Sequence, residues 1–402
     1  MRDMLLAHHG LVGSGGASGV GHGPVDLDVE VHGLPLDALE RILVRLGPVN
    51  LVGRAFSVFK LSLGGADIDV SLPRRDSRVR PGHRGIRAQG DPWLGLVEAA
   101  RRRDLTVNAI AFDPLSDELV DPFHGEADLK RRLLRAVDPA TFTEDPLRAL
   151  RVPQFAARFR FDVDPALREL CGSVPVHELP AERIHGELRK LLMLPSAPSW
   201  GLRVGVEASL WRRLHPALAQ LDWEPVYRAV DQAVAARDGV LAGQPGRAEA
   251  LMLCALLHPV DPGQLESVFD RLDVHSAAGF SLRGAVQGAL ARAPALTAPI
   301  PDGALRTLAR EARRMGGLRL WLALAQALGR DCAGPARRAE ELGVGLEPPG
   351  PLVSGRDLKA LGMAPGPDMG VLLEELYLRQ LEEGIQDSAV LLEGLGPAPR
   401  GP

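Results

Sequence analysis

The sequence is poor in aromatic residues and cysteine, and it has no long apolar run. Aromatic side chains make up 4% of the 402 residues. Cys171, Cys254 and Cys332 lie far apart, which argues against a cysteine-based metal site or a disulfide framework and suggests a reducing compartment. No run approaches the ~18 apolar residues of a membrane span, and no basic and apolar leader begins the chain. We therefore expect a cytoplasmic protein with no membrane partner.

The chain also lacks an excess of positive charge. Its 47 Lys and Arg residues face 51 Asp and Glu residues, which gives a formal net charge of −4. A site for a polyanion would therefore have to be a local cluster of arginines. Hydrophobic residues at 46% and charged residues at 24% are typical of a globular chain. The length suggests roughly two to four domains.

The pattern of apolar residues changes near residue 140. Before it, mixed strand and helix patterns alternate, and they include a helix that ends at Gly47. From Pro146 onward, apolar residues recur at helical spacing between Pro and Gly clusters, so we expect only helices there. The fold class is therefore α+β, with a small mixed-sheet head followed by an all-helical remainder. The expected strands are 25–31, 51–63 and 66–72, and a basic loop is expected at 73–90.

Acidic residues alternate with apolar ones on two of these strands. Asp26 and Asp28 leave the same face of the first strand, and Asp67 and Asp69 repeat the arrangement on a later one. Pairing the two strands would bring several carboxylates together, where protonation or cations must relieve their repulsion. Carboxylate oxygens of this kind suit Mg²⁺. The same alternation also occurs on the solvated face of an edge strand, so it is a weak signal by itself.

The segment RRRDLTVNAIAFDP, residues 101–114, sets three arginines before an aspartate and places Asn108 in an apolar run. A buried asparagine needs hydrogen-bond partners for its amide. Asn108 in a turn with solvated arginines fits this pattern, and so does a hydrogen-bonding role in a binding site. The motifs described next favour the binding site.

Four motifs follow one another in order, namely RRRDLTVNAIAFDP, LVDPFHGEADLKRRLLRAV, TEDPLRALRVPQFAARFRF and ERIHGELRKLL. This series resembles the class II nucleotidyltransferases, the family of bacterial CCA-adding tRNA enzymes and poly(A) polymerases. The segment from Pro351 resembles the tail of the same enzymes. The resemblance implies a catalytic head at 1–139, a neck with a nucleobase-reading motif at 140–200, a degenerate HD-like body at 201–345 and a tRNA-binding tail at 346–402.

The resemblance also implies the chemistry. Two Mg²⁺ ions would be held by Asp26 and Asp28, with Asp69 as the third catalytic carboxylate. The RNA 3′-hydroxyl would attack the α-phosphate of ATP or CTP, and pyrophosphate would leave. The expected partner is tRNA, and no protein partner is expected. The implied nucleotide-binding residues are Arg2, Arg103, Asp104, Asn108, Asp145, Arg148 and Arg151.

Asp145 and Arg148 belong to an EDxxR pattern, and Arg151 follows one helical turn later. The resemblance implies that they read the edge of the incoming base, since side chains three apart on a helix share a face. Asp145 before Pro146 also fits a helix N-cap followed by proline at the first helical position. The two roles are compatible.

The chain departs from the family pattern at its start and within the neck. Arg2 and Asp3 match the end of a GGxVRD motif whose glycines are missing. We expect a start upstream of Met1, and the alternative is a catalytically impaired RNA-binding relative. Gln154 stands where many members have an arginine, and Pro153 removes a backbone donor in mid-helix.

The body departs as well. Pro259 follows His258 where a metal-dependent hydrolase has an aspartate, and His215 is isolated. We expect a structural body without hydrolase activity.

Several activities remain open. Addition of CCA to tRNA is the first reading, and enzymes that add only CC, only the terminal A, or a poly(A) tract share the same motifs. An enzyme that acts on a small acceptor in place of RNA is a further alternative. The basic segment Arg74–Gly90 is where a difference between these activities is expected, because loops can move between additions.

Overall fold

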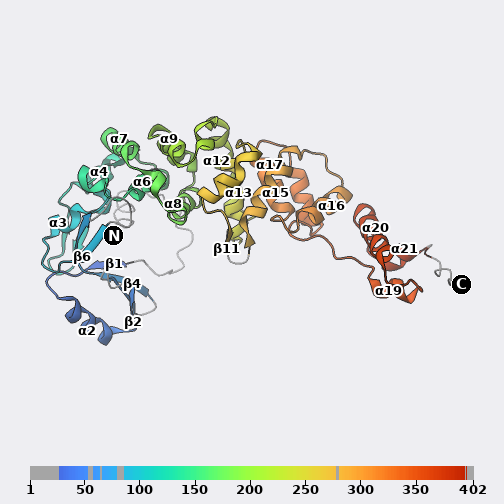
Figure 1. Cartoon of the computed structure of the whole chain (residues 1–402), viewed down its shortest axis with the longest axis horizontal. Helices are drawn as coiled ribbons and strands as arrows, with labels where there is room; N and C mark the ends of the chain where they lie inside the picture. The colour runs from blue at the N-terminus through green and yellow to red at the C-terminus, as the bar shows by residue number, and fades with distance from the viewer. Residues whose placement is uncertain are drawn as a thin grey trace. The chain divides into compact units, whose positions relative to one another are not determined.

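The computed structural model describes residues 27–52, 58–63, 66–78, 86–277, 280–393 and 395. Arg2 and Asp26, both expected at the site, lie outside these ranges. The chain divides into two compact units, the first comprising residues up to Leu191 with Trp200–Ala219, the second Leu192–Ser199 with the chain from Gln220 (Figure 1). No helix within the described ranges is long and apolar enough to cross a membrane.

The first unit opens with a four-stranded sheet. β1 pairs in parallel with β4, and β3 pairs antiparallel with both β4 and β2, so the sheet is mixed, as the sequence predicts. The helix predicted before Gly47 is α2 (Leu36–Leu46). In sheet order the strands are β1 (Leu27–Glu30), β4 (Ala66–Ser71), β3 (Val58–Leu63) and β2 (Val49–Val52).

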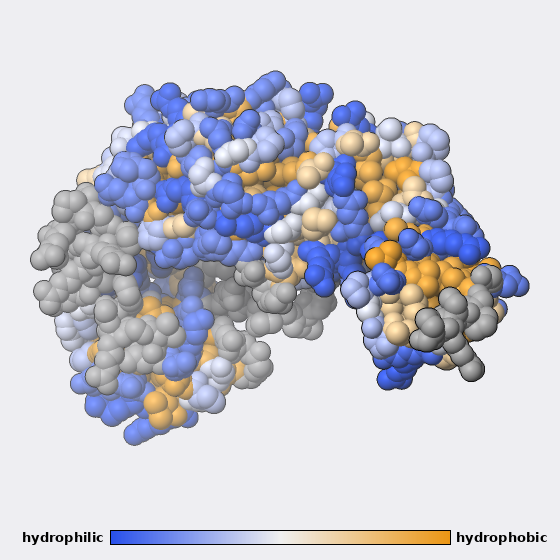
Figure 2. Space-filling view, turned by 45° about the vertical axis from the view of Figure 1, so that its right-hand side comes forward, coloured by the Kyte–Doolittle hydropathy of each residue, from blue (hydrophilic) through white to orange (hydrophobic). Residues whose placement is uncertain are grey.

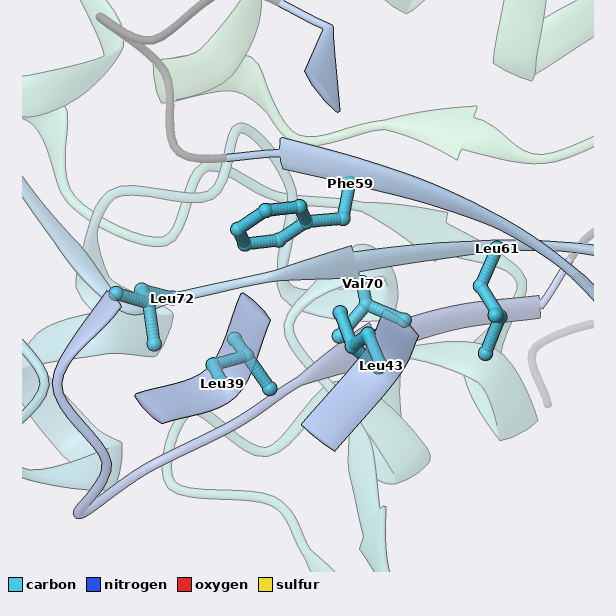
Figure 3. Packing of buried hydrophobic residues seen from close by; sticks show 6 residues of the cluster. All are labelled: Leu39, Leu43, Phe59, Leu61, Val70 and Leu72. Atoms are coloured by element: carbon cyan, nitrogen blue, oxygen red, sulfur yellow. The ribbon is translucent and has the colours of Figure 1, made fainter. Parts of the chain in front are cut away.

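Helix α2 packs on one face of this sheet (Figure 3). Its Leu39 and Leu43 meet a cluster of buried strand residues that includes Phe59 and Val70. Successive side chains of a strand point to opposite faces. Because α2 covers the face of Val70, the neighbouring Asp69 points to the opposite face.

The basic segment after β4 forms a hairpin. β5 (Arg74–Arg78) pairs antiparallel with β6 (Ile86–Gly90). The predicted loop at 73–90 is therefore wrong for these two stretches. The two strands are held by their backbone ladder. β5 has no apolar residue, and the short alternation of Ile86 and Ala88 in β6 is too brief to reveal a strand.

The remainder of the first unit is mainly helical, but it contains a two-residue parallel pairing of β9 with β10. The expectation of helices alone after Pro146 is wrong there, and at the β11–β12 pair of the second unit, because strands of two residues are too short to show a period. The main elements are α3 (Leu96–Arg101), η2 (Thr106–Asn108), β7 (Ala111–Asp113), β8 (Glu118–Val120), α4 (Gly125–Arg131), β9 (Leu133–Leu134), α5 (Pro139–Phe142), α6 (Leu147–Phe159), β10 (Asp162–Val163), α7 (Pro165–Ser173), α8 (Ala181–Met193), α9 (Pro198–Glu207), α10 (Leu210–Leu214) and α11 (Pro216–Ala219).

The second unit is built from helices around a buried α13 and α17. A separate apolar cluster forms among the last helices, with Leu358 and Leu376 in its interior. Figure 2 shows hydrophobic surface on one face of these last helices. The elements are α12 (Trp223–Asp238), α13 (Pro245–Leu257), α14 (Leu265–Arg271), β11 (Ser276–Ala277), β12 (Phe280–Ser281), α15 (Leu282–Arg292), α16 (Asp302–Ala312), α17 (Leu318–Ala327), α18 (Ala333–Glu341), α19 (Gly355–Ala360), α20 (Pro367–Glu383) and α21 (Ser388–Leu392).

One glycine fixes the approach of α4 to the motif that precedes it. A Cβ at Gly125 would lie 2.3 Å from the Thr106 carbonyl oxygen and 2.7 Å from Ile110 Cγ1. Gly125→Ala should therefore lower the free energy of unfolding by about 1–3 kcal/mol through overpacking. The matched control is Gly186→Ala in α8, where a Cβ meets nothing within 4 Å. That control should be neutral or stabilising by up to ~1 kcal/mol, since alanine favours helix. Urea denaturation compares the two; equal stability would contradict the close approach.

Candidate active site

The register of the sheet sets two carboxylates side by side. Asp28 of β1 lies directly opposite Asp69 of β4 in the parallel ladder. Both side chains therefore lie on the face that α2 does not cover. Lys60 of β3 lies opposite Asp69 on its other side, with 3.8 Å between Nζ and Oδ1. The Asp69 side chain is 44% exposed, so water and a substrate can reach it.

These two carboxylates fit a hard divalent cation. Their oxygens and their partial exposure suit Mg²⁺, which keeps several waters and binds through one or two carboxylates plus substrate phosphate. Asp26, the other predicted metal ligand, is outside the described residues, and so is the side chain of Asp67. Within the described part of the chain, no group of three His, Cys, Asp or Glu residues could hold a metal.

A third acidic residue of β1, which the sequence reading assigned no role, lies at the edge of the site. Glu30 Oε2 accepts from Arg102 Nη2 at 2.5 Å, and Glu30 Oε1 lies 3.2 Å from His32 Nε2. The other ring nitrogen of His32 lies 3.0 Å from the Leu94 carbonyl oxygen. Glu30 belongs to the same alternation of acidic and apolar residues as Asp28. Its partner Arg102 is 72 residues away, so the local pattern could not predict this ion pair.

The three consecutive arginines have different surroundings. Arg101 turns toward Asp138 at 3.1 Å and toward the ring of Phe123, away from β1. Arg102 makes the ion pair with Glu30. Arg101 and Arg102 therefore do not form one solvated face.

Arg103 is half-buried, and its guanidinium makes no hydrogen bond to any residue that the structure describes. Burial and then the charge of Arg102 lower its pKa, while Glu30, Asp28 and Asp104 act in the opposite direction. An arginine with free donors near Asp28 is suited to a phosphate group.

Asp104 holds together two of the other predicted residues. It is 7% exposed and accepts from Arg151 Nε at 2.6 Å, Asn108 Nδ2 at 2.9 Å and the Leu105 N–H at 2.9 Å. Burial raises the pKa of this carboxyl, but Arg151 and the hydrogen bonds outweigh burial and hold its pKa below the usual value. Asp104 therefore fixes the positions of the Arg151 and Asn108 side chains.

Arg148 ties the start of α6 to the end of α3. Its guanidinium donates to the carbonyl oxygen of Thr141 at 2.5 Å and to that of Arg102 at 2.6 Å. These bonds connect the EDxxR motif to the arginine cluster. Both terminal nitrogens of Arg148 thus donate to backbone carbonyls in this structure.

Asp145 pairs with a residue of α8. Its Oδ2 lies 3.1 Å from Arg183 Nη2, and its Oδ1 accepts from the Leu147 N–H, also at 3.1 Å. The second contact is of the capping kind expected from the Asp–Pro sequence, although α6 begins at Leu147 with Pro146 before it. The Arg148 N–H donates to the Asp145 carbonyl oxygen at 3.0 Å, but the described structure shows no bond between the two side chains. Arg183 lies in the ERIHGELRKLL motif, which was noted without a role for this arginine.

The two departures in α6 are part of the core. The helix continues through Pro153, and Gln154 is 2% exposed. A Cβ at Gly201 would lie 2.2 Å from the Pro153 carbonyl oxygen, so α9 packs closely there. Gln154 thus faces the interior, where packing against neighbours restricts what can replace it.

The histidines considered for the body make local contacts. His215 Nδ1 accepts from the Ala217 N–H at 3.1 Å, at the start of α11. His258 Nδ1 lies 3.0 Å from the Ala255 carbonyl oxygen, and burial lowers its pKa. The absence of hydrolase activity stays a prediction.

Asp104→Asn should destabilise the first unit by about 2 kcal/mol near neutral pH, because a buried charge-assisted bond to Arg151 is weakened. The folded-state pKa of Asp104 is depressed, so its stabilisation is present above the unfolded pKa of about 4 and is lost as pH falls through the folded value. The deficit of the variant should therefore shrink below about pH 4. Asp117→Asn on the exposed β7–β8 turn is the control. Chemical denaturation across pH measures both, and a deficit independent of pH would contradict the assignment.

The described geometry agrees with comparisons to known proteins. Residues 2–135 match the family model of the poly A polymerase head domain. A "Multifunctional CCA protein" of Nitrosospira multiformis is 36% identical over 187 residues, 43% of this chain and 44% of the relative. A protein of the same name from Stenotrophomonas maltophilia is 40% identical over 178 residues, 42% of each chain. The chain thus matches less than half of the length of these curated relatives.

Solved CCA-adding enzymes share the fold. An apo form has a TM-score of 0.70 at 21% identity, covering 98% of this chain and 89% of the solved chain. The Thermotoga maritima enzyme complexed with tRNA gives 0.62 at 20% identity, covering 92% and 86%. Further structures of this fold are complexes with CTP and with ATP. Residues 2–135 are thus similar to the poly A polymerase head domain, and the chain shares the fold of the solved CCA-adding enzymes.

Proposed function

We propose that the chain is a template-independent tRNA nucleotidyltransferase that adds CCA, or part of it, to tRNA 3′ ends from CTP and ATP. The observation that carries this proposal is the register of Asp28 beside Asp69, with the unbonded guanidinium of Arg103 near Asp28, in a segment similar to the poly A polymerase head domain. The names of the curated relatives and the ligands of the solved enzymes agree with it.

In the proposed reaction the oxygen of the RNA 3′-hydroxyl forms a bond to the α-phosphorus, and the bond from that phosphorus to the bridging oxygen breaks. Pyrophosphate leaves with the electron pair, and the hydroxyl proton passes to solvent. Mg²⁺ at Asp28, Asp69 and, by family resemblance, Asp26 would make the hydroxyl more acidic and offset the charge on the phosphoryl group. Positioning is the task left to the other side chains.

Five residues share the positioning in this proposal. Arg103 donates to the triphosphate, because its donors have no described protein partner. Asp104 orients Arg151 and Asn108, which line the sugar and base. Arg2, which the family resemblance adds, lies outside the described residues.

We propose that the base is read from the start of α6. Asp145 would accept from the exocyclic amine of C or A, and Arg148 or Arg151 would donate to a ring acceptor. To bind the base, Arg148 would have to give up at least one of its hydrogen bonds to backbone carbonyls. The Asp145 carboxylate would have to accept from the base while it remains paired with Arg183.

The proposed organisation is a head (1–139), a neck (140–200), a body (201–345) and a tail (346–402), with the last two holding tRNA by shape and phosphate contacts. The reaction would take place in the cytoplasm.

Transcripts of tRNA that end before CCA, after CC and after CCA, incubated with labelled CTP or ATP and Mg²⁺, test the function directly. Extension of the first transcript by all three nucleotides is expected. Addition of CC alone, of A alone, or of a long A tract identifies the corresponding alternative. Extension of no transcript overturns the proposal.

Asp28→Ala should lower the rate of nucleotide transfer by at least ~10³-fold, because the metal-binding carboxylate pair is lost. The affinity for tRNA should change less than about twofold, since phosphate contacts elsewhere dominate binding. Asp37→Ala in the first turn of α2 is the control, because α2 lies on the opposite face of the sheet. Single-turnover extension and filter binding give the two quantities. Full turnover by Asp28→Ala would disprove the metal assignment.

Asp145→Ala should lower the preference for CTP over UTP by about tenfold or more, because the amine of C loses a directed acceptor worth roughly 1–3 kcal/mol, whereas U has no amine at that position. Arg183→Ala is the companion variant, since it removes the partner of Asp145 and leaves the carboxylate in place. Competition between the two nucleotides at a fixed transcript measures the preference. An unchanged ratio in Asp145→Ala would show that the base is read elsewhere.

A further inference from the structure

A tryptophan lies exposed on the turn between the basic hairpin and α3. Trp93 is 73% exposed, although it belongs to a class of side chain that is usually mostly buried. The neighbouring Leu96 and Val97, at the start of α3, are 47% and 48% exposed. The three residues follow one another closely in sequence, directly after β6 and at the start of α3. Figure 1 shows α3 beside β6. We call these three residues the Trp93 patch.

The turn that carries Trp93 is fastened to both carboxylate strands. Beyond β1, the Gly33 N–H donates to the Pro92 carbonyl oxygen at 2.7 Å, and His32 Nδ1 lies 3.0 Å from the Leu94 carbonyl oxygen. Beyond β4, the Asp91 N–H donates to the Pro73 carbonyl oxygen at 2.7 Å. The turn is therefore fixed at the carboxyl ends of the two strands that contribute Asp28 and Asp69.

The turn is also held from within. The Trp93 N–H donates to Asp91 Oδ1 at 3.1 Å, and the Leu94 N–H donates to the Asp91 carbonyl oxygen at 3.0 Å. A Cβ placed on Gly33 would lie 3.9 Å from the indole. An exposed ring on such a turn is rigid, and binding to it costs little further ordering.

The distance to the carboxylates is short on the scale of a nucleotide chain. Gly33 lies five positions after Asp28, and an extended chain spans at most ~3.6 Å per residue, so the two Cα atoms lie within about 18 Å. The Trp93 ring borders Gly33. This upper limit corresponds to about five nucleotides stacked at ~3.4 Å each.

The sequence that leads into the Trp93 patch favours a polyanion over an apolar protein partner. The segment 74–90, which leads into the turn, contains six arginines and one aspartate. Its strand ends meet at the Arg74–Gly90 pair, directly before Asp91. A stacking surface beside positive charge is the arrangement by which proteins hold single-stranded nucleic acid.

We propose that the Trp93 patch binds the unpaired 3′ end of the acceptor RNA, with the Trp93 indole stacked on a base close to the terminal nucleotide. This inference rests on the proposed function and names the primer-side contact of the same site. Stacking of this kind is tolerant of sequence, because every base presents a π-face. Such a contact would serve an RNA end whose last base changes as nucleotides are added.

The test uses the full chain and an RNA hairpin with a short 3′ overhang that carries 2-aminopurine as its last base. Trp93→Ala should weaken binding of this RNA by roughly 5- to 100-fold, the range expected for one base–aromatic stack. It should raise the KM for RNA and leave the dissociation constant of CTP and ATP unchanged. Stacking quenches 2-aminopurine, so the quenching seen with the natural protein should disappear in this variant.

Two further variants make the result specific. Trp93→Phe keeps an aromatic ring and should recover most of the affinity. Leu115→Ala removes an apolar side chain of the same unit that is 96% exposed on the β7–β8 turn, and it should bind as the natural protein does. Equal RNA affinity and equal quenching for the natural protein and Trp93→Ala would overturn the inference.

Failure of the proposed function gives a different result. If the natural protein extends no RNA but still quenches the overhang in a Trp93-dependent way, the patch binds RNA and the proposed reaction is wrong. If transfer proceeds and Trp93→Ala has no effect on RNA binding or KM, the reaction stands and the patch is rejected. A patch that serves a protein partner would give this second result.

Discussion

The candidate site depends on the buried carboxylate of Asp104. It accepts hydrogen bonds from the side chains of Arg151 and Asn108 and from the backbone N–H of Leu105. A carboxylate in the interior is tolerated only when its charge is paired and its oxygens are bonded. Here the pairing joins α6 to the segment that follows α3. Arg148 strengthens the same junction through two carbonyl oxygens. Residues from two motifs almost fifty positions apart thereby form one wall.

The sheet sets the positions of the other two carboxylates of the site, Asp28 and Asp69. Because α2 takes the apolar face, the register forces Asp28 and Asp69 onto the open one, where like charges lie side by side. Lys60 beside Asp69, and Arg103 near Asp28, offset part of that repulsion without closing the site. Negative charge that is only partly compensated is the condition under which a divalent cation is bound.

Local patterns in the sequence were sufficient to predict the strands and helices whose apolar residues recur with a regular period. Alternation predicted the carboxylate strands, and Gly47 marked the end of α2. The contacts of Glu30 with Arg102, and of Arg148 with backbone carbonyls, join positions far apart, and no local period encodes them. The hairpin at 74–90 was missed because β5 is RRDSR, which has no apolar residue, and β6 is IRAQG, which is too short and too polar to stand out in an arginine-rich segment. The Asp–Pro pair in the sequence was enough to predict that Asp145 caps a helix. The ion pair of Asp145 with Arg183 could be seen only in the tertiary structure.

The parallel pairing of β1 with β4 also bears on how the head is synthesised. α2, β2 and β3 lie between the two strands in sequence, so Asp28 can meet Asp69 only after these elements have been made. Contacts between distant positions form late, because the loop that joins them must be ordered first. A nascent chain still emerging from the ribosome would thus carry separated carboxylates with no common ligand. Competence would arrive in one step, when the fourth strand docks.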